Sequence, residues 1–221
     1  MTATIKMLSA AAASQLDRDL MSFGAFSIDQ LMELAGLSVA QALYKLQQPD
    51  PDRKTNIAIL CGTGNNAGDG LRLCTQLEAL GVPFKNQLAE VIDPANYIID
   101  ALFGFNFSGP VREPFPCVIE AMEKTLKPIL SVDVPSSWDV DNGPPNKGVG
   151  KDFYPTALIS LTAPKPCFKF LPKTSRHFLG GRFVSPDILK KYGLELPKYP
   201  GYEQVVEITG LELNNTRDDE N

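Results

Sequence analysis

The sequence has 221 residues and a formal net charge of −5. This acidic balance argues against a binder of DNA or RNA, which needs a basic surface, so we expect no nucleic-acid partner. The length suits one α/β domain with a single sizeable core, and no apolar run approaches the ~20 residues that span a bilayer, so we expect no membrane partner either.

Cysteine usage favours a reducing compartment. The four cysteines, Cys61, Cys74, Cys117 and Cys167, are widely spaced and form no C-x-x-C pair, which argues against a zinc site and against a disulfide framework. We expect a cytoplasmic protein. A mitochondrial location is the alternative, because residues 1–14 are poor in acidic side chains.

Two helices are expected before the first strand. Residues 9–20, SAAAASQLDRDL, are rich in good helix formers, and Ser9 is a candidate N-cap. Residues 27–46 place apolar side chains on one helical stripe, and Ser27 with Gln30 has the spacing of a capping box. Both helices should pack against a flat surface, such as a sheet.

Strands and helices alternate through the rest of the chain. Four short apolar runs, at residues 56–60, 97–103, 128–134 and 157–163, are typical of buried parallel strands. Helices are expected at residues 112–126 and 186–192, with a late strand at 180–184. This alternation predicts an α/β fold with a Rossmann-like, doubly wound, mostly parallel sheet, helices on both faces and the N-terminal helices packed on it. We expect one domain over residues 1–213 and a polar tail at 214–221.

A glycine-rich turn, CGTGNNAGDG at residues 61–70, follows the first predicted strand. Its spacing departs from the dinucleotide motif G-x-G-x-x-G, because Ala67 stands where the third glycine belongs, and no P-loop lysine follows Gly70. The glycines alone could serve only a tight turn. The adjacent amides of Asn65 and Asn66 favour a ligand site, because they add donors and acceptors where backbone amides already face a ligand.

Carboxylates follow three of the predicted strands. Asp69, Asp100 and Asp133 should meet at one edge, since the carboxyl ends of parallel strands lie together. With Asn66 and Ser136 they form an oxygen-only set that suits a hard cation, and its low charge favours a monovalent ion. An N-cap or an Asx turn is an equal alternative for Asp69.

Three further residues have less specific roles. His177 is the only histidine, and we expect it at the surface or in packing, because no activated serine or cysteine accompanies it. Trp138 is expected to pack beside a site. Lys165 has two open interpretations, a group for proton transfer or charge stabilisation and a solvated turn lysine.

Six motifs in order resemble the NAD(P)H-hydrate epimerases, also known as the apolipoprotein A-I-binding-protein family, and fungal members most closely. They are MELAG at residues 32–36, GTGNNAGDG at 62–70, DALFGFNFSGPVREPF at 100–115, SVDVPSSWDVDNG at 131–143, SLTAPKPC at 160–167 and GGRFV at 180–184. The resemblance implies interconversion of the R and S forms of hydrated NADH or NADPH, whose reduced nicotinamide ring carries a hydroxyl. A separate dehydratase would then repair the S form, and relatives often form homodimers.

The resemblance also implies site residues. Substrate contacts fall on Asn65, Asn66, Ala67, Gly68, Asp69, Gly104, Phe105, Asn106, Phe107, Ser108, Gly109, Pro110 and Asp133. One potassium ion per subunit would be bound by Asn66, Asp100 and Ser136. This agrees with the hard, monovalent site expected from the residue types.

The chain also departs from the family pattern. Thr63 stands for a usual proline, Ala67 for a glycine and Ser137 for a glycine, while Ser108 and Pro110 replace a lysine and an acidic residue. The segment between residues 80 and 97 is also too short for the strand and helix that relatives carry there.

Epimerisation requires that the bond from the reacting carbon to hydroxyl or nitrogen break and form again on the other face. We hypothesise that Asp133 is the acid/base residue, because it lies at a strand end beside Ser136. A non-catalytic nucleotide- or protein-binding module is the alternative, favoured by Ala67 and the short segment. An NAD-dependent oxidoreductase would need a ribose-binding acid about 20 residues past the glycine turn, where Glu90 lies.

Overall fold

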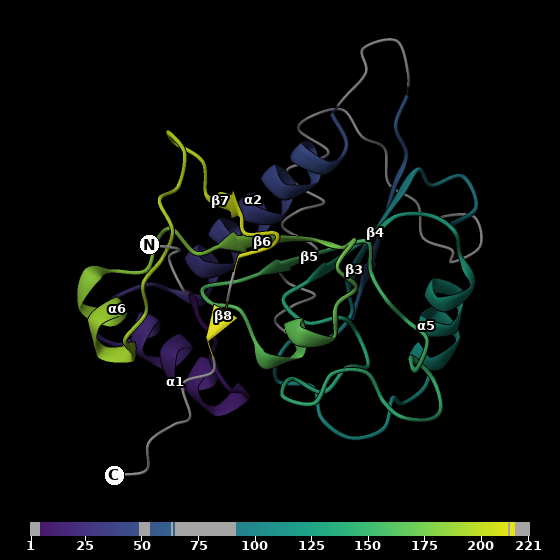
Figure 1. The fold of residues 1–221 in the computed structure, drawn as a ribbon, viewed down its shortest axis with the longest axis horizontal. Helices are drawn as coiled ribbons and strands as arrows, with labels where there is room; N and C mark the ends of the chain where they lie inside the picture. Colours follow the sequence, from purple (N-terminus) through teal and green to yellow (C-terminus); the bar gives the residue numbers. More distant parts are fainter. Residues whose placement is uncertain (1–4, 49–53, 63, 65–91, 212, 215–221) are drawn as a thin grey trace.

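The computed structural model describes residues 5–48, 54–62, 64, 92–211 and 213–214. Within these residues the main sheet has six strands in the order β2-β3-β4-β5-β6-β7, of which the first five are parallel and the last is antiparallel to its neighbour. Their bounds are β2 Ile57–Cys61, β3 Tyr97–Ala101, β4 Ile129–Val132, β5 Ala157–Ser160, β6 Arg176–Gly180 and β7 Val205–Glu207. Two short strands, β1 (Ile5–Lys6) and β8 (Leu213–Asn214), pair in parallel as a separate sheet (Figure 1).

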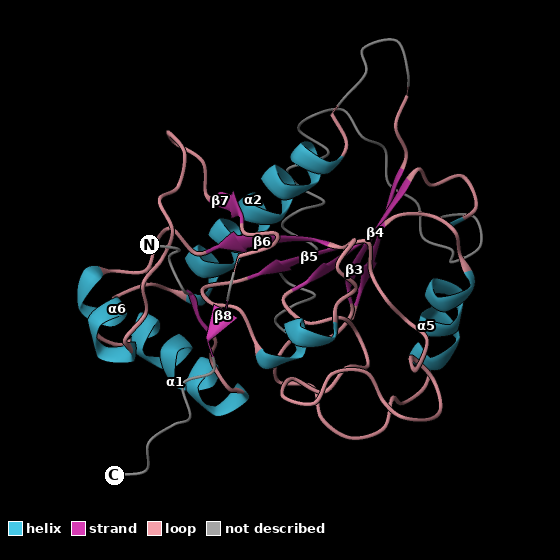
Figure 2. Ribbon diagram, in the orientation of Figure 1, coloured by secondary structure: helices cyan, strands magenta, loops and turns pink. Residues whose placement is uncertain are grey.

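Helices cover both faces of the main sheet, as the sequence predicts (Figure 2). On one face α2 (Ile28–Leu46) buries Val39 and Leu43 against strand residues that include Ile99. On the other face α5 (Phe115–Lys124) buries Ile119 against strand residues that include Ile98. Alternate residues of β3 therefore belong to different cores, which explains the unbroken apolar runs of these strands. The described strands follow chain order, so no reversal of strand order lies among them.

The two N-terminal helices have different partners. Helix α2 begins at the predicted capping box, in which the Ser27 hydroxyl accepts from the Gln30 N–H and the Gln30 side chain accepts from the Ser27 N–H. It packs on the sheet. Helix α1 (Ala10–Met21), capped by Ser9, packs instead on α6 (Pro186–Tyr192). None of the described helices is long and apolar enough to cross a membrane.

The predicted late strand at residues 180–184 is wrong, because β6 ends where that strand was expected to begin. Gly181 has φ +107°, which stops the strand, and residues 182–183 form a turn. The two residues that begin β6 lack apolar character, but both have partners. Arg176 forms an ion pair with Glu207 on β7, and the buried His177 ring bonds to Ser160 on β5. Because the first two residues of β6 are polar, the pattern of apolar residues did not predict this interior strand.

Candidate functional site

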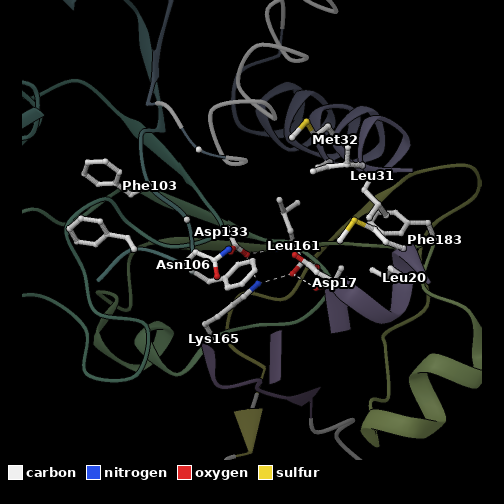
Figure 3. A pocket seen from close by; sticks show the side chains of 18 of the residues that line it. Asp17, Leu20, Leu31, Met32, Phe103, Asn106, Asp133, Leu161, Lys165 and Phe183 are labelled. Atoms are coloured by element: carbon white, nitrogen blue, oxygen red, sulfur yellow. Dashed lines mark hydrogen bonds and ion pairs between the residues drawn. The ribbon is translucent and has the colours of Figure 1, made fainter. Parts of the chain in front are cut away.

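A pocket of about 300 Å³ lies at the carboxyl ends of β3, β4 and β5, where α1 and α2 close over the sheet edge (Figure 3). Leu20 of α1, with Leu31 and Met32 of α2, supplies an apolar wall. Three charged side chains, Asp17, Asp133 and Lys165, also line the pocket, and Figure 3 shows them pointing toward one another. The pocket therefore combines an apolar wall with a cluster of charged side chains, as ligand sites commonly do.

Two tight turns end the central strands at this pocket. At the end of β4, Asp133 has φ +67°, and the Val134 N–H donates to the Val132 carbonyl at 2.8 Å. At the end of β5, Thr162 has φ +63°, and the Ala163 N–H donates to the Leu161 carbonyl at 2.8 Å. Both are classic γ-turns, a rare and strained conformation, and such strain concentrates at functional sites. The turns also explain why β4 and β5 end before the predicted residues 134 and 163.

Asp133 and Lys165 form a buried ion pair, with side chains 4% and 2% exposed. The Lys165 ammonium also donates to the Leu161 carbonyl at 2.8 Å and lies over the Phe105 ring, 5.4 Å from its centroid. The Leu161 N–H donates to the same Asp133 oxygen at 3.1 Å. The interpretation of Lys165 as a solvated turn residue is therefore wrong. The pair places a carboxyl group and an amine in contact at the pocket, and such side chains are among the usual general acid/base groups of enzymes.

Asp100 and Ser136, two of the predicted ion ligands, lie together in a second buried cluster. The Ser136 hydroxyl donates to Asp100 at 2.5 Å, and the Ser136 N–H donates at 2.9 Å. The Ser131 hydroxyl donates at 2.8 Å and the Leu102 N–H at 3.5 Å. Burial raises the pKa of Asp100, although the hydrogen bonds from Ser136 oppose that shift. The third predicted ligand, Asn66, lies outside the described residues.

The loop after β3 divides into two parts. Gly104, Phe105, Asn106 and Phe107 line the pocket, as expected of substrate-contacting residues, whereas Ser108, Gly109 and Pro110 are exposed and lie outside its lining. The rings of Phe103 and Phe107 stack 4.5 Å apart at the entrance of this loop. Aromatic stacking of this kind fixes the loop backbone beside the pocket.

The glycine-rich turn is described only at its start, since Asn65, Asn66, Ala67, Gly68 and Asp69 lie outside the described residues. A Cβ at Gly62 would lie 2.1 Å from the Leu102 carbonyl oxygen, so this glycine is needed for close approach of two backbones. Gly64 lines the pocket, and a Cβ there would meet nothing within 4 Å among the described residues. The turn thus begins at the pocket.

Three outcomes concern single residues outside the predicted site. Trp138 is fully buried and donates to the Phe153 carbonyl at 3.0 Å, which confirms its packing role. His177 packs on Phe168 rather than lying at the surface, and burial lowers its pKa to about 3, so the ring is neutral. Asp17 was missed, because a carboxylate in a helix is commonly solvated. Its neighbours Leu16 and Leu20, both buried, place it beside the apolar stripe of α1 and are the signal that could have found it.

Comparison with known proteins gives the same assignment as the motifs. A family model described as YjeF-related protein N-terminus matches residues 28–85 and 78–167. Proteins named NAD(P)H-hydrate epimerase are similar over nearly their whole length. The Fusarium vanettenii protein is 51% identical over 95% of this chain and 99% of its own, and the Schizosaccharomyces pombe protein is 46% identical over 96% and 99%. The crystal structure of a yeast protein matches with a TM-score of 0.80 at 32% identity, covering 92% of this chain and 100% of that chain.

The comparisons also bear on the short segment. The alignment with the Fusarium vanettenii protein runs over 238 positions although this chain has 221 residues, so the relative carries residues that this chain lacks. The family model matches in two segments that overlap at residues 78–85, at the start of the segment that is short for the family. Together with the fold and the strand-end pocket, these matches show that the chain belongs to the NAD(P)H-hydrate epimerase family, with the domain of the YjeF-related protein N-terminus.

Proposed function

We propose that this protein interconverts the R and S forms of hydrated NADH and NADPH. The buried Asp133–Lys165 pair at the pocket is the observation that carries the proposal, because it supplies proton-transfer groups to a ligand bound at the strand ends. Relatives that are 46–51% identical along almost the whole chain are named NAD(P)H-hydrate epimerase, which supports the same activity.

The pocket suits one end of the substrate. Its volume of about 300 Å³ is at the lower limit of small-molecule pockets, too small for a whole dinucleotide. The apolar wall of Leu31 and Met32 would suit the flat nicotinamide ring, and the charged cluster of Asp17, Asp133 and Lys165 would then interact with its hydroxyl. The rest of the dinucleotide would extend out of this pocket, toward the start of the glycine-rich turn at Gly64.

Asp133 is the acid/base residue in this proposal. Epimerisation at the hydroxyl-bearing carbon needs a proton at the atom that leaves and removal of a proton when the bond forms again. Lys165 and the Leu161 N–H hold one oxygen of Asp133, so the carboxylate has a fixed direction in the pocket. Lys165 would also stabilise the negative charge that Asp133 carries between proton transfers.

Potassium fits the Asp100 cluster. The described donors to Asp100 are neutral hydroxyls and amides, and the described groups that set its pKa include no cation, so this fully buried carboxylate lacks a positive partner among them. A monovalent ion held by Asp100, Ser136 and Asn66 would supply that charge, and oxygen-only ligands are the chemistry that alkali cations prefer. When bound, the ion would neutralise part of the charge of the substrate diphosphate.

The central test is R-to-S conversion of hydrated NADPH, coupled to an external dehydratase that consumes only the S form. Asp133→Asn keeps the size of the side chain and removes its proton chemistry, so we expect a fall of ~10²–10⁴-fold in turnover. Asp139→Asn is the matched control, since Asp139 is exposed and lies in the same loop. Omitting potassium should lower the rate of the wild-type protein.

Two results would contradict the proposal. Wild-type turnover in Asp133→Asn would remove that residue from the mechanism. Binding of hydrated NADPH without conversion by the wild-type protein would select the non-catalytic binding module, and hydride transfer to an acceptor would select an oxidoreductase.

Partners and location are part of the proposal. An epimerase leaves the cofactor hydrated, so we infer that a separate dehydratase consumes the S form. We propose a homodimer in the cytoplasm, with a mitochondrial location as the alternative. Light scattering of the purified protein and fractionation of cells that express it would test these points.

A further inference from the structure

Asp17 is a charged group of the pocket that folding alone does not explain. It lies in α1 and lines the pocket together with Asp133 and Lys165 (Figure 3). No hydrogen bond between described residues involves its carboxylate. Asp19, two residues farther along the same helix, accepts hydrogen bonds from Gln15, Lys191 and Tyr192. Asp19 thus has a structural role in joining α1 to α6, whereas Asp17 faces a cavity.

The surroundings of Asp17 favour a carboxyl group that exchanges protons near neutral pH. Burial raises its pKa to about 6, with the Lys165 ammonium opposing the shift and the Asp133 charge adding to it. Lys165 and Asp133 are the charged groups that act on the pKa of Asp17, and the Asp17 charge in turn contributes to raising the pKa of Tyr192 on α6. Helix α2 presents apolar side chains to the same pocket. An acid of this strength can give and take a proton at physiological pH, which suits general catalysis.

We propose that Asp17 is a second acid/base residue of the epimerisation, a proposal that rests on the function given above. An epimerase must both protonate a leaving oxygen and deprotonate an entering one. Asp133 is tied to Lys165, whereas Asp17 has no described hydrogen-bond partner and can turn toward the substrate. Two carboxyl groups with different surroundings then share the two proton transfers.

The proposed steps balance without an added reagent. Protonated Asp17 gives its proton to the hydroxyl oxygen of the substrate. The carbon–oxygen bond breaks, its electron pair leaves with the oxygen as water, and the ring-nitrogen lone pair forms a carbon–nitrogen double bond. Water then adds to the other face of the carbon, and the proton that it loses passes to the Asp133 carboxylate and from there returns to Asp17. No electrons enter or leave, and the protein regains its starting protonation.

The experiment measures the pH dependence of kcat and KM for wild-type, Asp17→Asn and Asp17→Glu between pH 5 and 8.5, with the uncatalysed rate subtracted at each pH. We expect kcat of the wild-type protein to fall as pH rises past about 6, because the proton-donating form of Asp17 is lost. Asp17→Asn should lower kcat by ~10²–10⁴-fold. It should also abolish the fall of kcat above pH 6, which is the alkaline limb of the pH profile. Asp17→Glu should restore part of the rate together with the limb.

Two controls separate catalysis from folding and binding. Calorimetric titration with NADPH should give Kd values within about threefold for wild-type and Asp17→Asn, since the proposed role lies in proton transfer and not in affinity. Asp19→Asn should lower the melting temperature, because Asp19 joins two helices, yet keep the pH limb.

Four outcomes decide the matter. Loss of kcat and of the limb in Asp17→Asn, with NADPH affinity kept, supports the proposal. An Asp17→Asn protein with wild-type kcat and an unchanged limb overturns it, and so does a variant that changes only KM and NADPH affinity. An inactive wild-type protein would instead refute the proposed function itself.

Discussion

Replacing Lys165 by Met should destabilise the fold strongly, although methionine fills most of the same space. The substitution leaves the Asp133 carboxylate, 4% exposed, with the Leu161 N–H as its described donor. Removing one partner of a buried ion pair costs about 3–5 kcal/mol, because the remaining charge is desolvated without compensation. For a chain of this size each kcal/mol lowers Tm by about 2–4 °C, so we expect a fall of about 6–20 °C.

The double variant Asp133→Asn with Lys165→Met tests whether the unpaired Asp133 charge causes the loss of stability in Lys165→Met. It removes both charges, so we expect it to be more stable than Lys165→Met alone, with a coupling of at least about 2 kcal/mol in the double-mutant cycle. Urea unfolding at pH 7 supplies the free energies, with circular dichroism and the fluorescence of Trp138, the only tryptophan and fully buried, as two independent probes. Additive effects of the two single changes, or a loss below about 1 kcal/mol in Lys165→Met, would refute this account of the pair.

Three further predictions concern other parts of the site. Ser136→Ala removes a hydroxyl donor to Asp100 and a proposed potassium ligand, so the potassium concentration for half-maximal activity should rise about 10–100-fold; an unchanged value would exclude Ser136 as a ligand. The raised pKa of Asp17 means that the folded protein binds a proton more tightly than the unfolded chain, so stability should decrease as pH rises from about 4 to 6. Melting curves of wild-type and Asp17→Asn over that range should converge toward low pH, and parallel curves would contradict the shift. Conversion in ¹⁸O-labelled water should place the label in the S form if the carbon–oxygen bond breaks, and unlabelled product would indicate cleavage at nitrogen.

The sequence predicts the frame of this fold because its signals are local. The apolar run of β3 and the capping box of Ser27 with Gln30 each depend on neighbours in the chain, and both are confirmed. Strand β6 was misplaced because its register depends on distant partners. Arg176 is acceptable in a strand only through Glu207 on β7, and His177 only through Ser160 on β5. Hydrophobic periodicity contains no information about such pairs.

The candidate site was predictable where it follows the topology. Asp133 was found because the carboxyl ends of parallel strands form ligand sites. The positive φ angles of Asp133 and Thr162 were not predictable, since neither residue type signals a γ-turn. The turn is what brings the Asp133 carboxylate to Lys165. Asp17 was hidden for a different reason, since only the packing of α1 over the sheet edge shows that this side chain faces a cavity.

The positions of the charged pocket residues along the chain predict whether a family member with this short segment can be catalytically active. The charged groups of the pocket come from α1, the end of β4 and the loop after β5, and none of them lies near the short segment at residues 81–96 in sequence. We therefore expect the chemistry to survive and substrate binding to suffer. Compared with the Fusarium vanettenii relative under the same assay, kcat should lie within about tenfold while KM is raised. A raised KM at similar kcat indicates that contacts made equally to the substrate and to the transition state have been lost. A collapse of kcat at unchanged KM would mean that the missing residues position Asp133 or Lys165 in the transition state, and the described hydrogen bonds of that pair would not be sufficient for catalysis.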